Sequence, residues 1–274
     1  MKNFLKKLFD FYINSSIHVA LSVVSLSYLS IALSYKNATP LLLIFIFCCA
    51  CFSYNFIKFF PVFLNKKKNF RLKLILFISI GCILLAAQQF FNLKLATKIF
   101  VFFGAIIVLL YTIPLKNNKN LRDVRGFKIF LVVIGWLSLV VGVPISMAQK
   151  FDIDLFFQLL MIQGIYIFVA TIPFEIRDLD QDQPNALNIA QILGISNVKL
   201  LGYLLLIINL IFTFFSFGVF SAFSLSSAIS FLSLILLLYI VTPTHSKYLT
   251  SFWVESIPIF WSVIYYLLNF SMTI

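Results

Sequence analysis

Nine apolar stretches, each long enough to cross a lipid bilayer as a helix, divide this chain of 274 residues. A transmembrane helix needs about 20 mostly apolar residues to cross about 30 Å of hydrocarbon. Transmembrane strands would instead show a polar and apolar alternation that is absent here. With 62% hydrophobic and 11% charged residues, the composition is also that of a membrane protein. The sequence predicts an all-α, polytopic membrane protein with helices at residues 15–35, 40–60, 72–92, 97–115, 127–147, 155–174, 198–218, 222–241 and 252–271.

The basic residues favour one side of the predicted membrane. If the N-terminus is cytoplasmic, the outer segments contain only Lys36, Lys94, Lys98 and Lys150 of the 21 lysines and arginines. Because cytoplasmic loops are enriched in positive residues, we expect a multi-pass protein of the inner (cytoplasmic) membrane with its N-terminus inside and its C-terminus outside. The formal charge of +12 is spread over short loops that face anionic headgroups, so nucleic acid is not an expected partner.

Residues 1–14 form a basic, aromatic and amphipathic segment. Such a segment is typical of a helix that lies in the membrane interface, and we expect this and not a cleaved signal. The longest polar segment, from Glu175 to Lys199, is too short to build a core of its own. We therefore expect residues 1–274 to form a single transmembrane domain.

Four of the nine acidic residues lie between positions 175 and 182, where the sixth predicted helix leaves the hydrocarbon. On a helix Asp178 and Asp182 share a face, and Glu175 lies one turn earlier on roughly that face, whereas Asp180 points elsewhere. These carboxylates are candidates to hold a hard divalent cation such as Mg²⁺. The alternative is an acidic loop that pairs with Arg177 and the neighbouring basic loops.

Mg²⁺ usually shares its coordination with substrate phosphates, so a phosphate-bearing lipid would suit this site. Lysine and arginine are the expected ligands of a diphosphate. Candidates are Lys116, Lys119 and Arg122 after the fourth predicted helix, and Lys58 with Asn55 near the end of the second. Control of membrane topology is the alternative role for these basic residues.

Five segments give the chain a resemblance to the UbiA-type family of intramembrane prenyltransferases. Residues 175–182, followed by Ile192–Gly194, resemble the second aspartate-rich motif of that family and the tail after it. Tyr111–Lys116, Leu121–Asp123 and Gly126–Lys128 resemble the segment that follows the fourth helix of the family. The number of predicted helices also agrees.

The resemblance implies a helical bundle around a central cavity, in which Mg²⁺ bridges the diphosphate of an isoprenoid donor. The donor would ionise to an allylic cation that an aromatic or related acceptor captures. By position, Asp178 and Asp182 would hold the metal, with Glu175 beside them, and Lys116, Lys119 and Arg122 would steady the diphosphate together with Asn55 and Lys58.

The chain departs from the family at its first motif, Asn-Asp-x-x-Asp. The aligned residues are Asn55, Phe56, Ile57, Lys58 and Phe59, so phenylalanines replace both aspartates. In one interpretation Lys58 supplies a fixed positive charge in place of one Mg²⁺. In the other, the protein keeps the fold and binds an isoprenoid lipid or a partner protein without catalysis.

Three functions therefore stay open: an Mg²⁺-dependent prenyltransferase, a non-catalytic relative, and a transporter. Transport is disfavoured because the acidic residues lie at a membrane face and not at the midplane. The nature of the acceptor is not predicted. Glu255, at the start of the ninth helix, is expected to pair with Lys247 or to be solvated.

Overall fold

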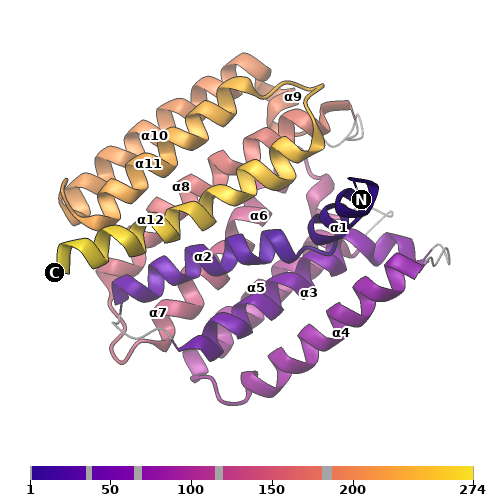
Figure 1. Cartoon of the computed structure of the whole chain (residues 1–274), viewed down its shortest axis with the longest axis horizontal. Coiled ribbons are helices and arrows are strands. Elements are labelled where there is room, and N and C mark those ends of the chain that lie inside the picture. Colours follow the sequence, from indigo (N-terminus) through magenta and orange to yellow (C-terminus); the bar gives the residue numbers. More distant parts are fainter. Residues whose placement is uncertain (1, 35–38, 65–69, 115–119, 181–186, 274) are drawn as a thin grey trace.

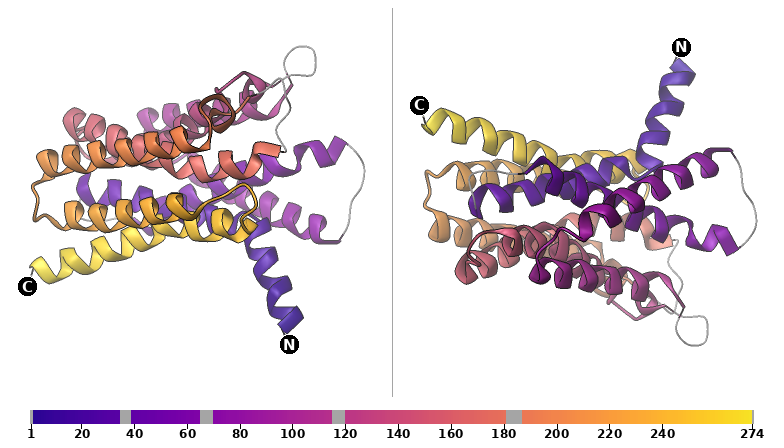
Figure 2. Two further views of the ribbon diagram at one scale, coloured as in Figure 1. Left: turned by 90° about the horizontal axis from the view of Figure 1, so that it is seen from above. Right: turned by 90° about the horizontal axis from the view of Figure 1, so that it is seen from below.

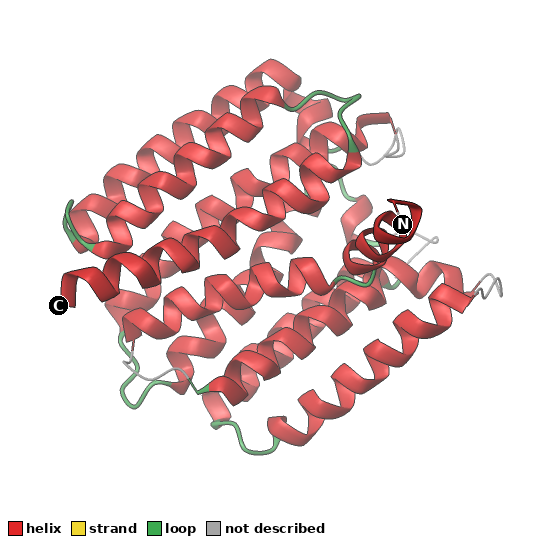
Figure 3. Ribbon diagram, viewed as in Figure 1, coloured by secondary structure: helices red, strands yellow, loops and turns green. Residues whose placement is uncertain are grey.

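The computed structural model describes residues 2–34, 39–64, 70–114, 120–180 and 187–273, and within these ranges nine helices are long and apolar enough to cross a membrane. All nine predicted spans and the all-α membrane architecture are confirmed (Figure 3). The spans are α2 (Ile17–Ser34), α3 (Pro40–Leu64), α4 (Phe70–Phe90), α5 (Leu95–Thr112), α6 (Lys128–Leu137) continued by η2 (Ser138–Gly142) and α7 (Val143–Met147), α8 (Ile153–Arg177), α10 (Ile195–Phe217), α11 (Ala222–Ile240), and η4 (Leu249–Val254) continued by α12 (Glu255–Thr273).

Eight of these spans pack into a closed ring. The order of contacts around the ring is α2, α3, α5, α6, α8, α10, α11 and α12, and α12 packs back onto α2. The remaining span, α4, packs on α3 (Figure 1). The ends of α3 and α8 and the beginnings of α6 and α12 lie together at the end of the bundle that carries α1 (Lys2–Asn14), and we call this the α1 end.

The α1 helix leaves the bundle at a steep angle (Figure 2). Its Asp10 accepts hydrogen bonds from the Tyr248 hydroxyl at 2.8 Å and from Lys247 Nζ at 3.0 Å, and these two contacts lower the pKa of Asp10. Phe4 and Leu5 are exposed on the same helix. An apolar face of this kind on a basic helix is what a helix lying in the membrane interface requires.

Two spans contain a wide π-helical turn, and in both a proline explains it. Proline has no N–H and its ring collides with the carbonyl group four residues earlier. For Pro144 that residue is Val140, within η2, and for Pro258 it is Val254, the last residue of η4. The turn before Pro258 ends at Val254, so it sets the position at which the next residue, Glu255, begins α12.

Small and polar residues bring the helices of the ring together, as is usual in lipid. Gln163 on α8 donates to Ser30 Oγ on α2 at 3.0 Å, and Asn209 on α10 donates to the carbonyl of Ile162 at 2.9 Å. Gly202 on α10 is one point of close approach: a Cβ atom there would lie 2.6 Å from Leu238 Cδ2 on α11.

Substitution of Gly202 by valine is expected to destabilise the bundle by about 1–3 kcal/mol, because the added methyl groups overpack the contact of α10 with α8 and α11. Thermal unfolding of the purified protein in detergent would measure this. Gly81→Val is the matched control, since a Cβ at Gly81 meets no atom within 4 Å. Equal melting temperatures for the two variants would contradict the packing argument.

Candidate functional site

A cavity of about 290 Å³ opens inside the ring at the α1 end. We call it the polar cavity because six acidic or basic side chains of the Asp, Glu, Lys and Arg types line it. Three are cations and three are carboxylates, contributed by α3, α6, the end of α8 and the start of α12: Lys58, Lys128, Arg177, Glu175, Asp178 and Glu255. Tyr166 and Phe174 of α8 and Ile13 of α1 complete parts of its wall.

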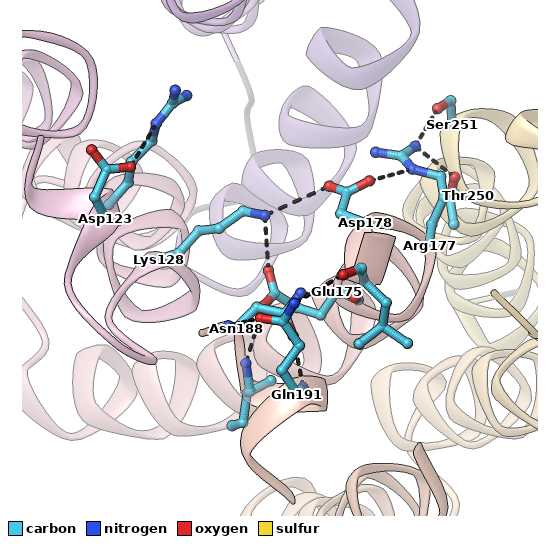
Figure 4. A network of polar contacts seen from close by, with 12 residues as sticks. Asp123, Lys128, Glu175, Arg177, Asp178, Asn188, Gln191, Thr250 and Ser251 are labelled. Atoms are coloured by element: carbon cyan, nitrogen blue, oxygen red, sulfur yellow. Dashed lines mark hydrogen bonds and ion pairs between the residues drawn. The ribbon is translucent and has the colours of Figure 1, made fainter. Parts of the chain in front are cut away.

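Lys128 joins two of the carboxylates predicted from the sequence. Its Nζ lies 3.4 Å from Glu175 Oε1 and 3.6 Å from Asp178 Oδ2 (Figure 4). Glu175 is buried, and its other oxygen accepts a hydrogen bond from the backbone N–H of Ile189 at 3.3 Å. Glu175 therefore anchors Lys128 and the start of α9 (Ile189–Leu193), whereas Asp178 faces the cavity.

Arg177 ties the end of α8 to the π-helical turn η4. Its Nε donates to Asp178 Oδ1 at 2.8 Å, and its Nη1 donates to the hydroxyls of Thr250 and Ser251 at 2.9 and 3.2 Å (Figure 4). Its guanidinium also lies 5.1 Å from the centre of the Phe174 ring. Asp178 is thus paired with two cations, Lys128 and Arg177.

The candidate diphosphate and metal ligands predicted from the sequence lie in different surroundings. Asn55 is buried, lines neither cavity that we describe and donates to Ser79 Oγ on α4 at 3.0 Å, whereas Lys58 lines the polar cavity. Arg122 lies 3.7 Å from Asp123 and 5.7 Å from the ring of Tyr111, which lines the cavity. Lys116, Lys119 and Asp182 lie outside the described residues.

Glu255 is the site residue that the sequence analysis misplaced. The expected pairing with Lys247 is not found, because Lys247 bonds Asp10. Glu255 instead lines the polar cavity, where Lys58 and Arg177 attract it electrostatically. An ionisable residue at the start of a span was the signal that could have identified it.

A second cavity, of about 360 Å³, adjoins the polar cavity, and we call it the apolar cavity. Aliphatic and aromatic side chains of α3, α5 and α6 form nearly all of its wall. Phe56, which stands where the family's first motif has an aspartate, is one of them. Five residues line both cavities and so mark the wall between them: Tyr54, Ile57, Tyr111, Val132 and Trp136.

The donor chemistry of the polar cavity suits a hard cation, because Mg²⁺ prefers carboxylate oxygens and takes its remaining ligands from water and phosphate. Asp178 and Glu175 supply such oxygens at the wall. Across the described ranges, no three His, Cys, Asp or Glu side chains group closely enough to hold a metal. The oxygens of these two carboxylates have Lys128, Arg177 and the backbone N–H of Ile189 as their partners in this structure.

Solved structures match this geometry over nearly its whole length. The apo structure of a UbiA homologue from Aeropyrum pernix K1 aligns with a TM-score of 0.66 and 13% identity, over 94% of this chain and 99% of that one. A UbiA homologue from Archaeoglobus fulgidus bound to GPP and Mg²⁺ gives 0.62 and 11%, over 94% and 98%. This chain has the UbiA-type fold.

A third match, from a study of digeranylgeranylglyceryl phosphate synthase, has a TM-score of 0.58 and 13% identity over 96% of this chain and 97% of that one. No protein-family model and no curated protein matches the sequence. The UbiA-like architecture expected from the motifs is confirmed. Identities this low establish the fold and leave the activity to be argued from the site.

Substitution of Lys128 by methionine is expected to destabilise the protein by about 3–5 kcal/mol, because it leaves the buried Glu175 carboxylate without its cation. Melting temperatures in detergent would report the loss. The double variant Lys128→Met/Glu175→Gln should recover much of it, since no uncompensated charge then stays buried. Lys150→Met, an exposed lysine at the other end of the bundle, is the control. A double variant no more stable than Lys128→Met would contradict the pairing.

Proposed function

We propose that this chain is a UbiA-type membrane prenyltransferase, which transfers an isoprenoid from a polyprenyl diphosphate to an aromatic or related acceptor in an Mg²⁺-dependent reaction. The observation that carries the proposal is the pairing of a charged cavity at the α1 end with an apolar cavity that shares its wall. A lipid diphosphate has the same division into a charged head and an apolar chain.

The charge of the polar cavity supports a role for a metal ion. Three cations face three carboxylates among its described lining residues, so their formal charges cancel. A diphosphate brings several negative charges, and a cation must enter with it to balance them. The A. fulgidus homologue was solved with GPP and Mg²⁺ together. In this chain Asp178 and Asp182 would hold Mg²⁺ next to Glu175, and the metal would stabilise the diphosphate as it leaves.

The cationic side chains Lys58 and Arg177 would have a separate role. Lys58 and Arg177 present N–H donors to the polar cavity, where they would bind phosphate oxygens and orient the donor carbon toward the apolar side. Asn55, Lys116, Lys119 and Arg122 are proposed to assist at the head group. The C–O bond to the diphosphate would break with its electron pair on the leaving diphosphate, the acceptor would then bond to the resulting allylic cation, and the acceptor would lose a proton.

Features of the same site favour or disfavour two other functions. Phe56 and Phe59 in place of the family's aspartates favour a protein that binds an isoprenoid lipid without turnover. Transport is less well supported, because the ionisable side chains of the polar cavity gather at the α1 end and not at mid-membrane.

The charge bias of the loops supports a further proposal about placement. We place the α1 end in the cytoplasm, with the N-terminus inside and the C-terminus outside the inner membrane, because most of the lysines and arginines that the structure describes lie at or near that end. The donor and Mg²⁺ would then reach the polar cavity from the cytoplasm.

Purified protein with Mg²⁺ and labelled polyprenyl diphosphates should release diphosphate, and Asp178→Ala and Asp182→Ala should slow this release about 10²–10³-fold, since each removes a metal ligand. Asp154→Ala, at the exposed opposite end of α8, is the control and should leave the rate unchanged. Tight binding of the donor without release in the wild type would identify the non-catalytic alternative.

A reporter fused to the C-terminus tests the orientation. Alkaline phosphatase folds only outside the inner membrane and green fluorescent protein fluoresces only inside, so the phosphatase fusion should be active and the fluorescent fusion dark. The reverse pair of results would overturn the cytoplasmic placement of the α1 end.

A further inference from the structure

Tyr54 on α3 and Trp136 on α6 meet at the wall between the two cavities. Trp136 Nε1 donates a hydrogen bond to the Tyr54 hydroxyl at 2.6 Å, and the two rings stand edge to face with centroids 6.3 Å apart. Both side chains line both cavities. The hydrogen bond pairs two polar groups that would otherwise lie unsatisfied in a low-dielectric interior, so it holds the two rings together.

The two cavities on either side of this pair differ in volume and in the polarity of their walls. At about 290 Å³ the polar cavity is near the lower limit of ligand pockets, which range over roughly 300–1,000 Å³. A diphosphate head with a short chain takes up such a space. A longer isoprenoid needs additional apolar volume, and the adjoining cavity of about 360 Å³ supplies it. To enter that volume from the polar cavity, the chain must cross the wall that the two rings help to form.

We propose that the hydrogen-bonded Tyr54–Trp136 pair determines the length of the isoprenoid chain that the site accepts. The pair closes part of the passage from the polar to the apolar cavity, so it favours donors whose chain ends before the wall. The proposal rests on the proposed function, because it assumes that the polar cavity binds a prenyl diphosphate. It assigns to this chain a specificity-determining contact between α3 and α6.

The glycine that precedes Trp136 provides an independent way to fill the apolar cavity. Gly135 lines that cavity and not the polar one, and a Cβ added there meets Ile107 Cγ2 at 3.5 Å, which is an ordinary contact. A leucine at this position would therefore occupy apolar volume while Tyr54 and Trp136 stay in place.

The experiment measures dissociation constants of dimethylallyl, geranyl, farnesyl and geranylgeranyl diphosphates by calorimetry, with Mg²⁺ and purified protein in detergent. Trp136→Ala opens the wall and should shift the preference toward the longer donors by about tenfold or more, because each newly buried CH₂ group contributes about 0.8 kcal/mol. Tyr54→Phe removes only the hydrogen bond and should shift the preference in the same direction by less. The double variant Gly135→Leu/Trp136→Ala should lose the gain.

Trp253→Ala is the matched control, because Trp253 is an exposed tryptophan that lines neither cavity. An unchanged chain-length preference in Trp136→Ala and Tyr54→Phe, measured on protein with a cooperative thermal transition, would overturn the role of the pair. A gain that persists in the Gly135→Leu double variant would show that the chain does not enter the apolar cavity, and would also overturn it. If the wild type binds none of the four donors, the proposed function itself fails.

Discussion

Charge balance within hydrocarbon is the constraint on which the α1 end of this bundle depends. Removing an ion from water costs several kcal/mol even after the protein relaxes, so charges that lie among transmembrane helices must be paired or hydrogen-bonded. Lys128 satisfies this requirement for Glu175 and contributes to it for Asp178. Arg177 supplies the second cation of Asp178 and extends the network to the hydroxyls of η4. Three spans, α6, α8 and the last, are therefore connected by one network of ion pairs and hydrogen bonds.

Local backbone features place these charges where they meet. Asn188 caps α9 by accepting a hydrogen bond from Gln191 N, and its Nδ2 donates to the Glu175 carbonyl, so the chain after α8 folds back onto the helix end. At the other side of the cavity, Pro258 accounts for the π-helical turn that ends just before Glu255. A regular helix through the same residues would rotate Glu255 by a different amount relative to α3 and α8.

The sequence predicted the spans well because the length of an apolar run is a property of the chain alone. It also predicted that Lys58 and Asp178 belong to one end of the bundle, since both lie near the ends of spans. The partnership of Lys128 with Glu175 was not predictable in this way. It depends on how each helix is rotated about its axis and on which helices become neighbours when the ring closes. For the same reason the sequence did not predict that Glu255 lines the polar cavity or that Tyr54 contacts Trp136.

The altered first motif has a consequence for both cavities. In place of two aspartates, α3 carries Phe56, which faces the apolar cavity, and Phe59, with Lys58 between them on the wall of the polar cavity. The last span carries a carboxylate, Glu255, that lines the polar cavity together with Lys58. With Lys58 on α3 and Glu255 on α12, the formal charges of the described acidic and basic lining residues sum to zero. The acidic and basic residues described in the polar cavity are thus balanced in formal charge, while Phe56 extends the apolar surface of the neighbouring cavity.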